Sequence, residues 1–361
     1  MKQPDPDTPS AAVAGAEEEI GASSPRRILI VSDAWQPQVN GVVRTLSAVA
    51  GELSRMGHVV DVIGPDRFRS IACPTYPEVR LALLPGRRLG RMIDAFAPDT
   101  LHVATEGPLG IAAARWARRR GLSYTTSFHT RFPEYIEART GLPPALIYPW
   151  LRRFHAAGSG MMVAAESLRA ELSARRFANV RAWSRGVDLD LFQPAPAEPW
   201  GLPRPIFVYV GRIAVEKNIG AFLDLDLSGS KIVVGAGPQL SALRRKYPAV
   251  RFAGARHGES LARAYAGADA LVFPSLTDTF GLVLLEALAC GTPIAAFPVT
   301  GPKDVLASGG ERIGAMDADL RRAALSALDA DRAACRAHAE RFGWRACAEG
   351  FLANLVPIGG R

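Results

Sequence analysis

Two carboxylates separated by seven residues are the most informative chemical feature of this chain. Asp278 and Glu286 bound a segment that reads Asp-Thr-Phe-Gly-Leu-Val-Leu-Leu-Glu. This pattern predicts a loop that runs into a helix, with Asp278 before the helix and Glu286 about two turns inside it. The first N–H groups of a helix have no internal partners and can bind an anion. The segment suits a polyhydroxylated ligand that carries phosphate, although a loop acid and a buried helix acid without a ligand also fit it.

Two cations and a glycine turn add to this candidate site. Arg212 and Lys217 follow a predicted strand over residues 206–210, and Gly235 and Gly237 follow another strand. Because ligands of parallel α/β sheets bind beyond the carboxyl ends of the strands, Arg212 and Lys217 could neutralise a diphosphate there. Taken alone, the two cations also fit ordinary surface charges, and Gly-x-Gly without a third glycine is a weak nucleotide signal.

Alternating apolar and amphipathic stretches indicate which elements position these residues. Such alternation is typical of α/β domains with parallel sheets. Strands are predicted at residues 28–31, 59–63, 99–103, 124–127, 161–163, 206–210, 231–234, 251–253, 270–273 and 293–296. Helices are predicted at residues 41–56, 109–120 and 144–155, between the later strands, and along a tail over 320–355. The fold class is thus α/β, with two doubly wound domains and a ligand cleft between the carboxyl ends of their sheets.

A proline-rich segment over residues 193–205 is the best candidate linker. It separates a first Rossmann-like domain over residues 26–192 from a second over residues 206–340. Residues 341–361 are predicted to form a C-terminal helix that could cross back to the first domain. Residues 1–25 are predicted to be a disordered leader, because they lack the basic start and apolar core of a secretory signal.

The formal net charge of +8 is concentrated in the first domain, where residues 26–190 contain 23 arginines and 14 acidic residues. The arginines gather in four clusters: Arg87, Arg88 and Arg91; Arg115, Arg118, Arg119 and Arg120; Arg152 and Arg153; Arg175 and Arg176. This surplus fits attraction to an anionic membrane surface, and it fits arginine-rich solvated helix faces equally well. No nucleic-acid-binding motif accompanies the charge, so nucleic acid is not an expected partner.

Other composition signals exclude several classes of protein. No apolar stretch is long enough to span a bilayer, and the four cysteines have neither metal-ligand nor redox spacing. We therefore expect a cytoplasmic protein with reduced thiols. Three Asp-x-Asp pairs begin at Asp188, Asp224 and Asp317, and none is read as a metal site, because fixed cations and a helix N-terminus can supply the same electrostatic stabilisation.

The order of the motifs resembles a known family. The chain contains Gly-Arg-x3-Glu-Lys-Asn, Val-Gly-x-Gly-Pro, Ala-Asp-Ala-Leu-Val-Phe-Pro-Ser and acid-x-Phe-Gly-Leu-x3-Glu, in that order. This set is similar to family-4 retaining glycosyltransferases, whose architecture is the GT-B fold, and the resemblance covers residues 26–356. Around Asp33, His129 and Arg185 the first domain resembles the branch that contains bacterial GDP-mannose-dependent α-mannosyltransferases.

The resemblance implies a role for each matched position. Arg212 and Lys217 would bind the donor diphosphate, Glu286 the nucleotide ribose, and Asp278 the donor sugar hydroxyls. His129 would lie beside the reacting sugar. The implied catalytic residues are His129, Arg212, Lys217 and Asp278. The implied substrate-binding residues are Asn40, Gly41, Arg185, Phe280, Gly281, Leu282, Val283 and Glu286. Two departures from the family pattern, Asp278 in place of Glu and Asn40-Gly41 in place of Gly-Gly, leave the donor sugar open.

The implied reaction is transfer of a hexose with retention of configuration, without a metal or cofactor. The first domain would face the acceptor, and the second would bind the nucleotide-sugar donor. The favoured reading is mannosyl transfer from GDP-mannose to a lipid-linked or membrane-associated glycan acceptor, by an enzyme peripheral on the inner face of the cytoplasmic membrane. Alternatives are a UDP-sugar-dependent glucosyl or sulfoquinovosyl transfer to diacylglycerol, a nucleotide-sugar epimerase, and a non-catalytic nucleotide-sugar-binding homologue.

Overall fold

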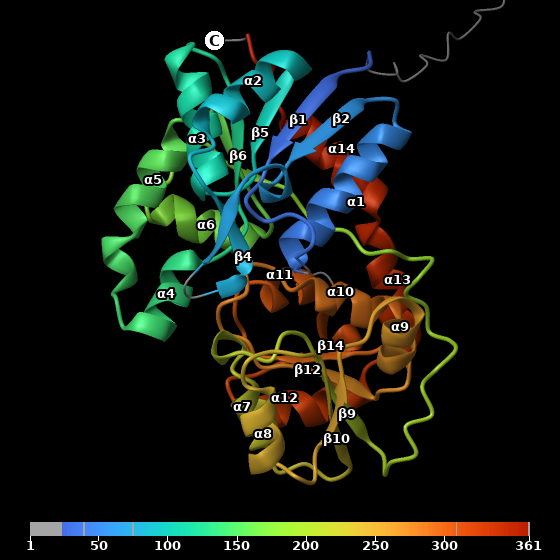
Figure 1. Cartoon of the computed structure of the whole chain (residues 1–361). Helices are drawn as coiled ribbons and strands as arrows, with labels where there is room; N and C mark the ends of the chain where they lie inside the picture. Colours follow the sequence, from blue (N-terminus) through green and yellow to red (C-terminus); the bar gives the residue numbers. More distant parts are fainter. Residues whose placement is uncertain (1–23, 39, 74–75, 308, 360–361) are drawn as a thin grey trace, which may run out of the picture.

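The computed structural model describes residues 24–38, 40–73, 76–307 and 309–359, which form two α/β domains placed one above the other (Figure 1). The predicted leader lies outside the described residues except for its last two positions. No helix among the described residues is long and apolar enough to cross a membrane.

The first domain is built on a six-stranded parallel sheet of order β2-β1-β5-β6-β7-β8. Its strands are β1 (Arg27–Val31), β2 (Val59–Ile63), β5 (Thr100–Val103), β6 (Thr125–Phe128), β7 (Gly160–Val163) and β8 (Val180–Ala182). Its helices are α1 (Gly41–Arg55), α2 (Gly86–Phe96), α3 (Pro108–Arg119), α4 (Phe132–Thr140), α5 (Tyr148–Ala156) and α6 (Glu166–Ala174). The central strands are buried along their length, as expected where helices cover both faces of a sheet, and this burial includes polar side chains of β5 and β6: Thr100, His102, Thr125, Thr126 and Ser127.

Several local features of the first domain differ from the sequence-based expectation, and strand β8 and helices α2, α4 and α6 were not predicted. An antiparallel hairpin of β3 (Ser70–Cys73) and β4 (Tyr76–Ala82) was not predicted. The helix predicted over residues 144–155 is divided into a 3₁₀ turn, η2 (Pro144–Leu146), and α5. Pro149 explains the division, because its ring removes an N–H donor and clashes with the carbonyl four residues earlier.

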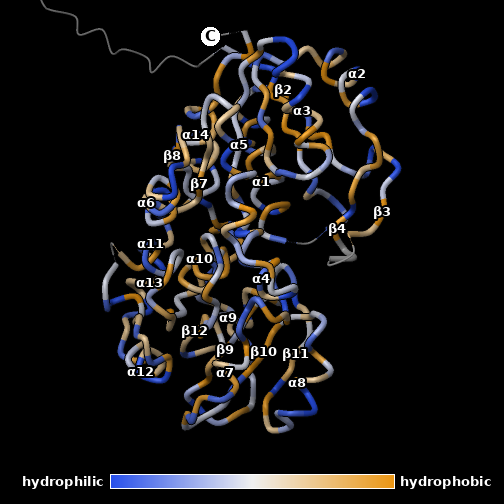
Figure 2. The backbone as a smooth tube through the Cα atoms, turned by 90° about the vertical axis from the view of Figure 1, so that its left-hand side faces the viewer, coloured by the Kyte–Doolittle hydropathy of each residue, from blue (hydrophilic) through white to orange (hydrophobic). Residues whose placement is uncertain are grey.

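The second domain has a six-stranded parallel sheet of order β11-β10-β9-β12-β13-β14. Its strands are β9 (Ile206–Val210), β10 (Ser230–Val234), β11 (Arg251–Gly254), β12 (Ala270–Phe273), β13 (Ile294–Ala296) and β14 (Gly314–Met316). Its helices are α7 (Ile219–Leu223), α8 (Leu240–Lys246), α9 (Gly258–Ala266), α10 (Leu282–Ala289), α11 (Pro302–Leu306), α12 (Leu320–Ser326) and α13 (Arg332–Ala339). Figure 2 shows hydrophobic strands inside both domains.

The strand orders determine where loops meet. In the second sheet the chain order reverses between β9 and β12, so the loops that follow these two strands open side by side. These loops carry Arg212, Lys217 and Asp278. In the first sheet the reversal lies between β1 and β5, and there the buried Asp33 accepts hydrogen bonds from Thr105 Oγ1 at 2.9 Å and from the N–H of Leu109 at 2.8 Å. Residues that are far apart in the sequence are thus brought to the two facing sheet edges.

The C-terminal tail is helical as predicted, but it is broken into separate helices and returns to the first domain. The last helix, α14 (Trp344–Asn354), packs on α1, and Figure 1 shows it in red beside the blue N-terminal elements. Phe351 is fully buried in the same core cluster as Ile28 and Leu46. The indole N–H of Trp183 donates to the carbonyl of Cys347 at 3.0 Å. The tail therefore ties the second domain to the first.

Phe351→Ala should lower the free energy of unfolding by about 3–5 kcal/mol, because it leaves a cavity where α14 meets the first-domain core. Urea denaturation followed by circular dichroism measures this loss. Glu349→Ala, at a half-exposed carboxylate on the same helix, is the matched control and should change stability by less than about 0.5 kcal/mol. A Phe351→Ala loss below about 1 kcal/mol would contradict this packing.

Candidate functional site

The loops after β9 and β12 meet as their positions in the sheet require. Lys217 ends a 3₁₀ turn after β9, and its Nζ donates to the Asp278 carboxylate of the β12 loop. Asn218 holds the same two loops together, because its side-chain amide donates to the carbonyl of Pro274 at 3.1 Å. Tyr209 fixes the start of the first loop by donating to the carbonyl of Arg212 at 2.7 Å. The structure thus brings together the predicted Arg212, Lys217 and Asp278.

Tyr135 of the first domain interacts electrostatically with Lys217 and Asp278. Burial alone would lower the pKa of Lys217. The Asp278 carboxylate, together with Tyr135 and Tyr209, has the larger effect and holds the pKa above its ordinary value. Burial together with Asp278 and Glu216 raises the pKa of Tyr135 on α4 to about 12. Lys217 therefore remains cationic and Tyr135 remains a hydroxyl donor at neutral pH. Sequence reasoning missed Tyr135, and no motif around it could have signalled its position.

Glu286 is a buried carboxylate with one partner from each domain. It is 2% exposed, and its Oε2 accepts the Tyr265 hydroxyl at 2.8 Å. Arg44 of α1 in the first domain places Nη1 2.5 Å from Oε1. This contact is an ion pair without an aligned hydrogen bond, because no donor is directed at Oε1. Arg44 lies one turn after Asn40 on α1, so its place at the first-domain loop could have been inferred from the sequence.

The position of Glu286 within its helix corrects a prediction. Helix α10 begins at Leu282, so Glu286 lies about one turn inside it and not two. Gly281 causes the difference, because its φ of 86° lies in the left-handed region and prevents an earlier helix start. The same glycine makes no side-chain cap, which leaves N–H groups of the first turn, near Leu282 and Val283, available to a ligand.

The Asn40-Gly41 loop approaches this helix start from the first domain. A Cβ added to Gly41 would lie 3.6 Å from Cδ1 of Leu282. Asn40 caps α1, since its Oδ1 accepts the N–H groups of Val42 and Val43 at 3.0 Å each. Asn40 therefore fixes the loop, and the close approach to α10 occurs at Gly41. Phe280, just before the helix, is buried.

His129 and Arg185 form a second buried group near the domain boundary. The backbone carbonyl of His129 accepts the Thr279 hydroxyl of the second domain at 2.8 Å, and its Nδ1 lies 3.2 Å from Nη2 of Arg185. Arg185 also donates to the carbonyl of Trp183 at 3.0 Å and stacks on that indole at 4.3 Å. Burial lowers the pKa of Arg185 to about 10. Burial and the Arg185 charge hold the pKa of His129 well below its ordinary value, so this imidazole is neutral.

Polar contacts close the two domains on each other. Arg139 of α4 pairs with Glu216 at 3.1 Å, and the N–H of Ser167 donates to Asp304 at 2.8 Å. Arg131, just before α4, donates two hydrogen bonds to the Glu171 carboxylate, at 2.9 and 2.6 Å. In this closed arrangement Lys217, Asp278 and Glu286 each have a partner of opposite charge. A surface hollow lined by Arg204, Asp269 and Arg332, among others, shares no residue with the site, and we assign it no role.

Comparisons with known proteins identify the family. A model described as Glycosyltransferase Family 4 matches residues 39–191, and one described as Glycosyl transferases group 1 matches residues 204–329. A GDP-mannose-dependent alpha-mannosyltransferase of Mycobacterium tuberculosis is 31% identical over 307 residues, which cover 78% of this chain and 81% of the relative. The chain belongs to glycosyltransferase family 4. Its resemblance to that family, and its identity as a hexosyltransferase, are confirmed.

A further relative is named for another transferred group, and the solved structures of similar fold carry other names. Sulfoquinovosyl transferase SQD2 of Arabidopsis thaliana is 30% identical over 326 residues, which cover 79% of this chain and 62% of SQD2. Among solved structures, a sucrose-phosphate synthase from Thermosynechococcus elongatus matches with a TM-score of 0.68 at 20% identity, covering 90% of this chain and 97% of that one. HepE of Anabaena, in complex with UDP and glucose, matches with a TM-score of 0.64 at 15% identity, covering 91% and 98%. The glycosyltransferase has the GT-B fold.

Acid should destabilise the glycosyltransferase through its buried histidines. The pKa of His102 is lowered to about 3, and that of His129 also lies below the ordinary value of 6.5, in both cases chiefly by burial. As the pH falls below 6.5, these two histidines bind protons in the unfolded chain but stay neutral in the folded chain. Each histidine thus lowers the free energy of unfolding by about 1.4 kcal/mol per pH unit as the pH falls.

His129→Asn tests this effect. Between pH 6 and 4 the variant should lose stability less steeply than the parent, by about 1.4 kcal/mol per pH unit, in urea denaturation. His257→Asn, at an exposed histidine, is the control and should keep the parental slope. Equal slopes for the parent and His129→Asn would show that His129 is charged in the folded state.

Proposed function

We propose that this glycosyltransferase transfers mannose from GDP-mannose, with retention, to a lipid-linked or membrane-associated acceptor in cell-envelope glycolipid or glycan synthesis. The pairing of Lys217 with Asp278 at the switch point of the second sheet is the observation that carries the transfer chemistry. The choice of donor is supported by relatives named GDP-mannose-dependent alpha-mannosyltransferase in Mycobacterium tuberculosis and Mycolicibacterium smegmatis, each 31% identical. We place the enzyme in the cytoplasm, peripheral on the inner face of the membrane.

We assign the donor to the second domain, over residues 206–340, and the acceptor to the first, over residues 26–192. Arg212 and Lys217 stabilise the diphosphate, together with the N–H groups at the start of α10. Asp278 then accepts hydroxyls of the sugar instead of the Lys217 ammonium. In this exchange the Lys217 cation gains phosphate oxygens as partners, and the Asp278 carboxylate accepts hydrogen bonds from neutral hydroxyls.

Glu286 binds the nucleotide ribose in this proposal. Its carboxylate is already directed by the Tyr265 hydroxyl, and burial together with Glu286 raises the pKa of Tyr265, which keeps that hydroxyl a donor. Ribose hydroxyls would compete with Arg44 for Oε1. Arg44 is 40% exposed and comes from the first domain, so its release connects donor binding to the domain boundary.

The proposed reaction is a front-face substitution. The bond between the anomeric carbon and the leaving phosphate breaks as the acceptor oxygen forms a bond to the same face of that carbon. The acceptor's hydroxyl proton passes to a leaving phosphate oxygen. Neutral His129 and the nearby Arg185 line the sugar side in this arrangement. A kinetically competent glycosyl–enzyme adduct on a side chain would overturn it.

A UDP-sugar donor is the second candidate. It is supported by the 30% identity to SQD2 and by the 25% identity to an alpha-monoglucosyldiacylglycerol synthase of Streptococcus pneumoniae. A homologue that binds nucleotide-sugar without turnover is disfavoured by the ordered Lys217–Asp278 pair.

Thermal-shift measurements with GDP-mannose, GDP, UDP-glucose and UDP separate these donors. GDP compounds should raise the melting temperature, because a ligand at about 100 times its Kd adds roughly 2.7 kcal/mol to the stability of the folded state. UDP compounds at equal concentration should leave the melting temperature unchanged. Stabilisation by UDP compounds alone would replace GDP-mannose as the donor.

Lys217→Ala should lower kcat for mannosyl transfer by about 100- to 1000-fold, because one fixed charge at the leaving group is lost. Radiolabelled transfer from GDP-mannose to a membrane-lipid extract measures the rate, and an unchanged circular dichroism spectrum establishes that the fold is intact. The matched control is Lys246→Ala, an exposed lysine on α8, which should retain the parental rate. Full activity in Lys217→Ala would exclude the assigned role.

A further inference from the structure

The connection between α4 and α5 exposes an apolar surface, which we call the apolar tip. It comprises residues 141–150, Gly-Leu-Pro-Pro-Ala-Leu-Ile-Tyr-Pro-Trp, with no charged side chain. Leu142, Leu146 and Trp150 are 42%, 67% and 46% exposed. Single exposed leucines are ordinary on a protein surface, but several large apolar side chains within ten residues mark an interaction surface.

The apolar tip has a defined conformation. Its 3₁₀ turn η2 packs against both α4 and α5, so the segment closes a helical hairpin. Trp150 stacks on Phe154 with ring centroids 6.0 Å apart and an interplanar angle of 27°. The hydroxyl of Tyr148 donates a hydrogen bond to the Glu134 carboxylate at 2.6 Å. Exposure of Leu142, Leu146 and Trp150 is therefore a property of the folded hairpin.

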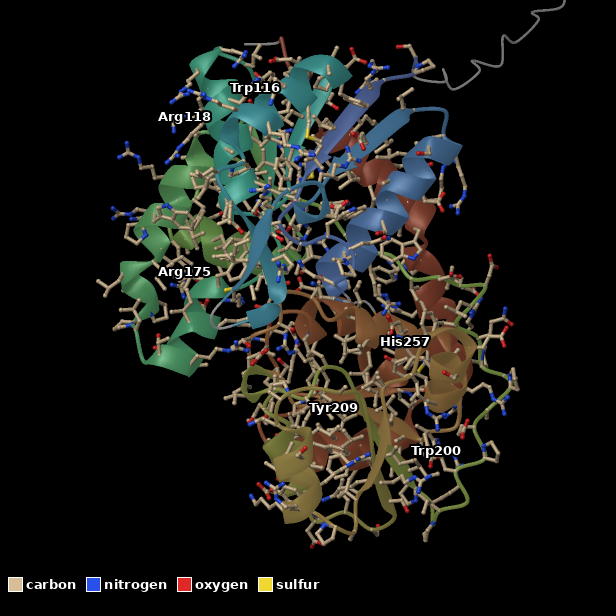
Figure 3. All side chains as sticks on the ribbon, viewed as in Figure 1. Trp116, Arg118, Arg175, Trp200, Tyr209 and His257 are labelled. Atoms are coloured by element: carbon tan, nitrogen blue, oxygen red, sulfur yellow. The ribbon has the colours of Figure 1, made fainter. Side chains whose placement is uncertain are left out.

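Basic residues border the apolar tip. Residues 138–165 contain no aspartate or glutamate. Arg152 on α5 donates to the carbonyl of Arg175 at 3.3 Å, and the Arg175 guanidinium stacks on the Tyr148 ring at 4.4 Å. Glu171 pairs with Arg175 and partly offsets its charge, whereas Arg153 is exposed on α5. Arg175 lies on the left side of Figure 3, the side of α4 and α5 that faces the viewer in Figure 2.

We propose that the apolar tip inserts into the interfacial region of an anionic lipid membrane, with Arg152, Arg153 and Arg175 at the phosphate level. Tryptophan and leucine favour the boundary between headgroups and acyl chains, and arginine binds lipid phosphate there. Of the four arginine clusters in the first domain, those at Arg152 and Arg175 adjoin an apolar surface beside the site. This inference rests on the proposed membrane-associated acceptor and names the surface that meets the membrane.

The position of the hairpin supports a lipid surface as its partner. Helix α4 contacts the second domain through Arg139 and Glu216, at 3.1 Å, and its Tyr135 lies in the field of Lys217 and Asp278. Arg139 lies at the C-terminal end of α4, two residues before the apolar tip begins, so the tip adjoins the contact between the hairpin and the second domain. Insertion of the apolar tip would place the boundary between the two domains next to the lipid headgroups, where a lipid-linked acceptor is found.

A second exposed apolar pair provides a matched control. Leu83 and Leu84 are 48% and 97% exposed, and the basic residues Arg87 and Arg88 follow them on α2. Helix α2 lies at the end of the first domain that is remote from the second domain (Figure 1). This pair has similar chemistry to the apolar tip but does not border the candidate site.

Cosedimentation of the full chain with lipid vesicles tests the proposal. The parent should bind vesicles of phosphatidylcholine mixed with phosphatidylglycerol, and bind phosphatidylcholine alone more weakly. The double variant Leu146→Glu/Trp150→Glu should lower partitioning into the anionic vesicles at least about tenfold. Arg152→Gln and Arg153→Gln should each lower it roughly fivefold. Leu83→Glu/Leu84→Glu should bind as the parent does.

Fluorescence provides a direct readout of insertion. Brominated phospholipid should quench part of the tryptophan emission of the parent, and this component should be absent in Trp150→Phe. Circular dichroism and the donor thermal shift verify that the variants are folded. These substitutions lie outside the donor site, so the thermal shift should not change.

Three outcomes would overturn the proposal: no vesicle binding by the parent, binding lost in Leu83→Glu/Leu84→Glu but kept in Leu146→Glu/Trp150→Glu, or a tip variant that alters only self-association in light scattering. Vesicle binding without mannosyl transfer would refute the proposed function and leave the membrane surface supported. Donor binding without vesicle binding would refute the apolar tip alone.

Discussion

The arrangement of the site depends on the cost of burying the Glu286 carboxylate. A buried charge without partners is far less stable than a solvated one, so the fold must supply a compensating cation and a hydrogen-bond donor. Tyr265 supplies the donor from within the second domain, and Arg44 supplies the cation from the first. Closure of the two domains is therefore linked to the charge state of this one side chain.

The same constraint explains the other polar contacts across the boundary. Glu216 is nearly buried and pairs with Arg139 of the first domain, and Lys217 pairs with Asp278 within the second. The reversal of strand order between β9 and β12 places these groups side by side. Arg185 differs, because its described partners are carbonyls, the His129 ring and the Trp183 indole.

Much of the fold could be read from the sequence because most of the parallel strands are continuous apolar runs. Every strand predicted for the two main sheets is present, within one or two residues of its predicted bounds. The missed hairpin of β3 and β4 has a mixed, partly exposed pattern that carries no strong period. The divided helix at residues 144–155 shows how Pro149 outweighs apolar periodicity.

The predictable part of the site comprises residues that follow strand ends or belong to the family motifs, in either domain. Strand ends and motif order located Lys217, Asp278 and Glu286. Their first-domain partners Arg44 and Tyr135 were not predicted. A contact between domains depends on the relative placement of two sheets, which local periodicity does not encode.

The charge balance of the closed state also indicates why the partners must come from both domains. We propose that Asp278 and Glu286 bind hydroxyls of the sugar and the ribose. Lys217 and Arg44 would then no longer have these carboxylates as partners. Together with Arg212, they would face the two negative phosphates of the donor. Such a hydroxyl is neutral and can satisfy a carboxylate only by hydrogen bonding, so the released cations require the diphosphate. Donor binding would thus exchange the Lys217–Asp278 and Arg44–Glu286 ion pairs for contacts to the diphosphate and to the hydroxyls. A ligand that lacks either the diphosphate or the hydroxyls would leave the cations or the carboxylates without new partners. This requirement favours closure around the intact nucleotide-sugar over closure around a fragment of it.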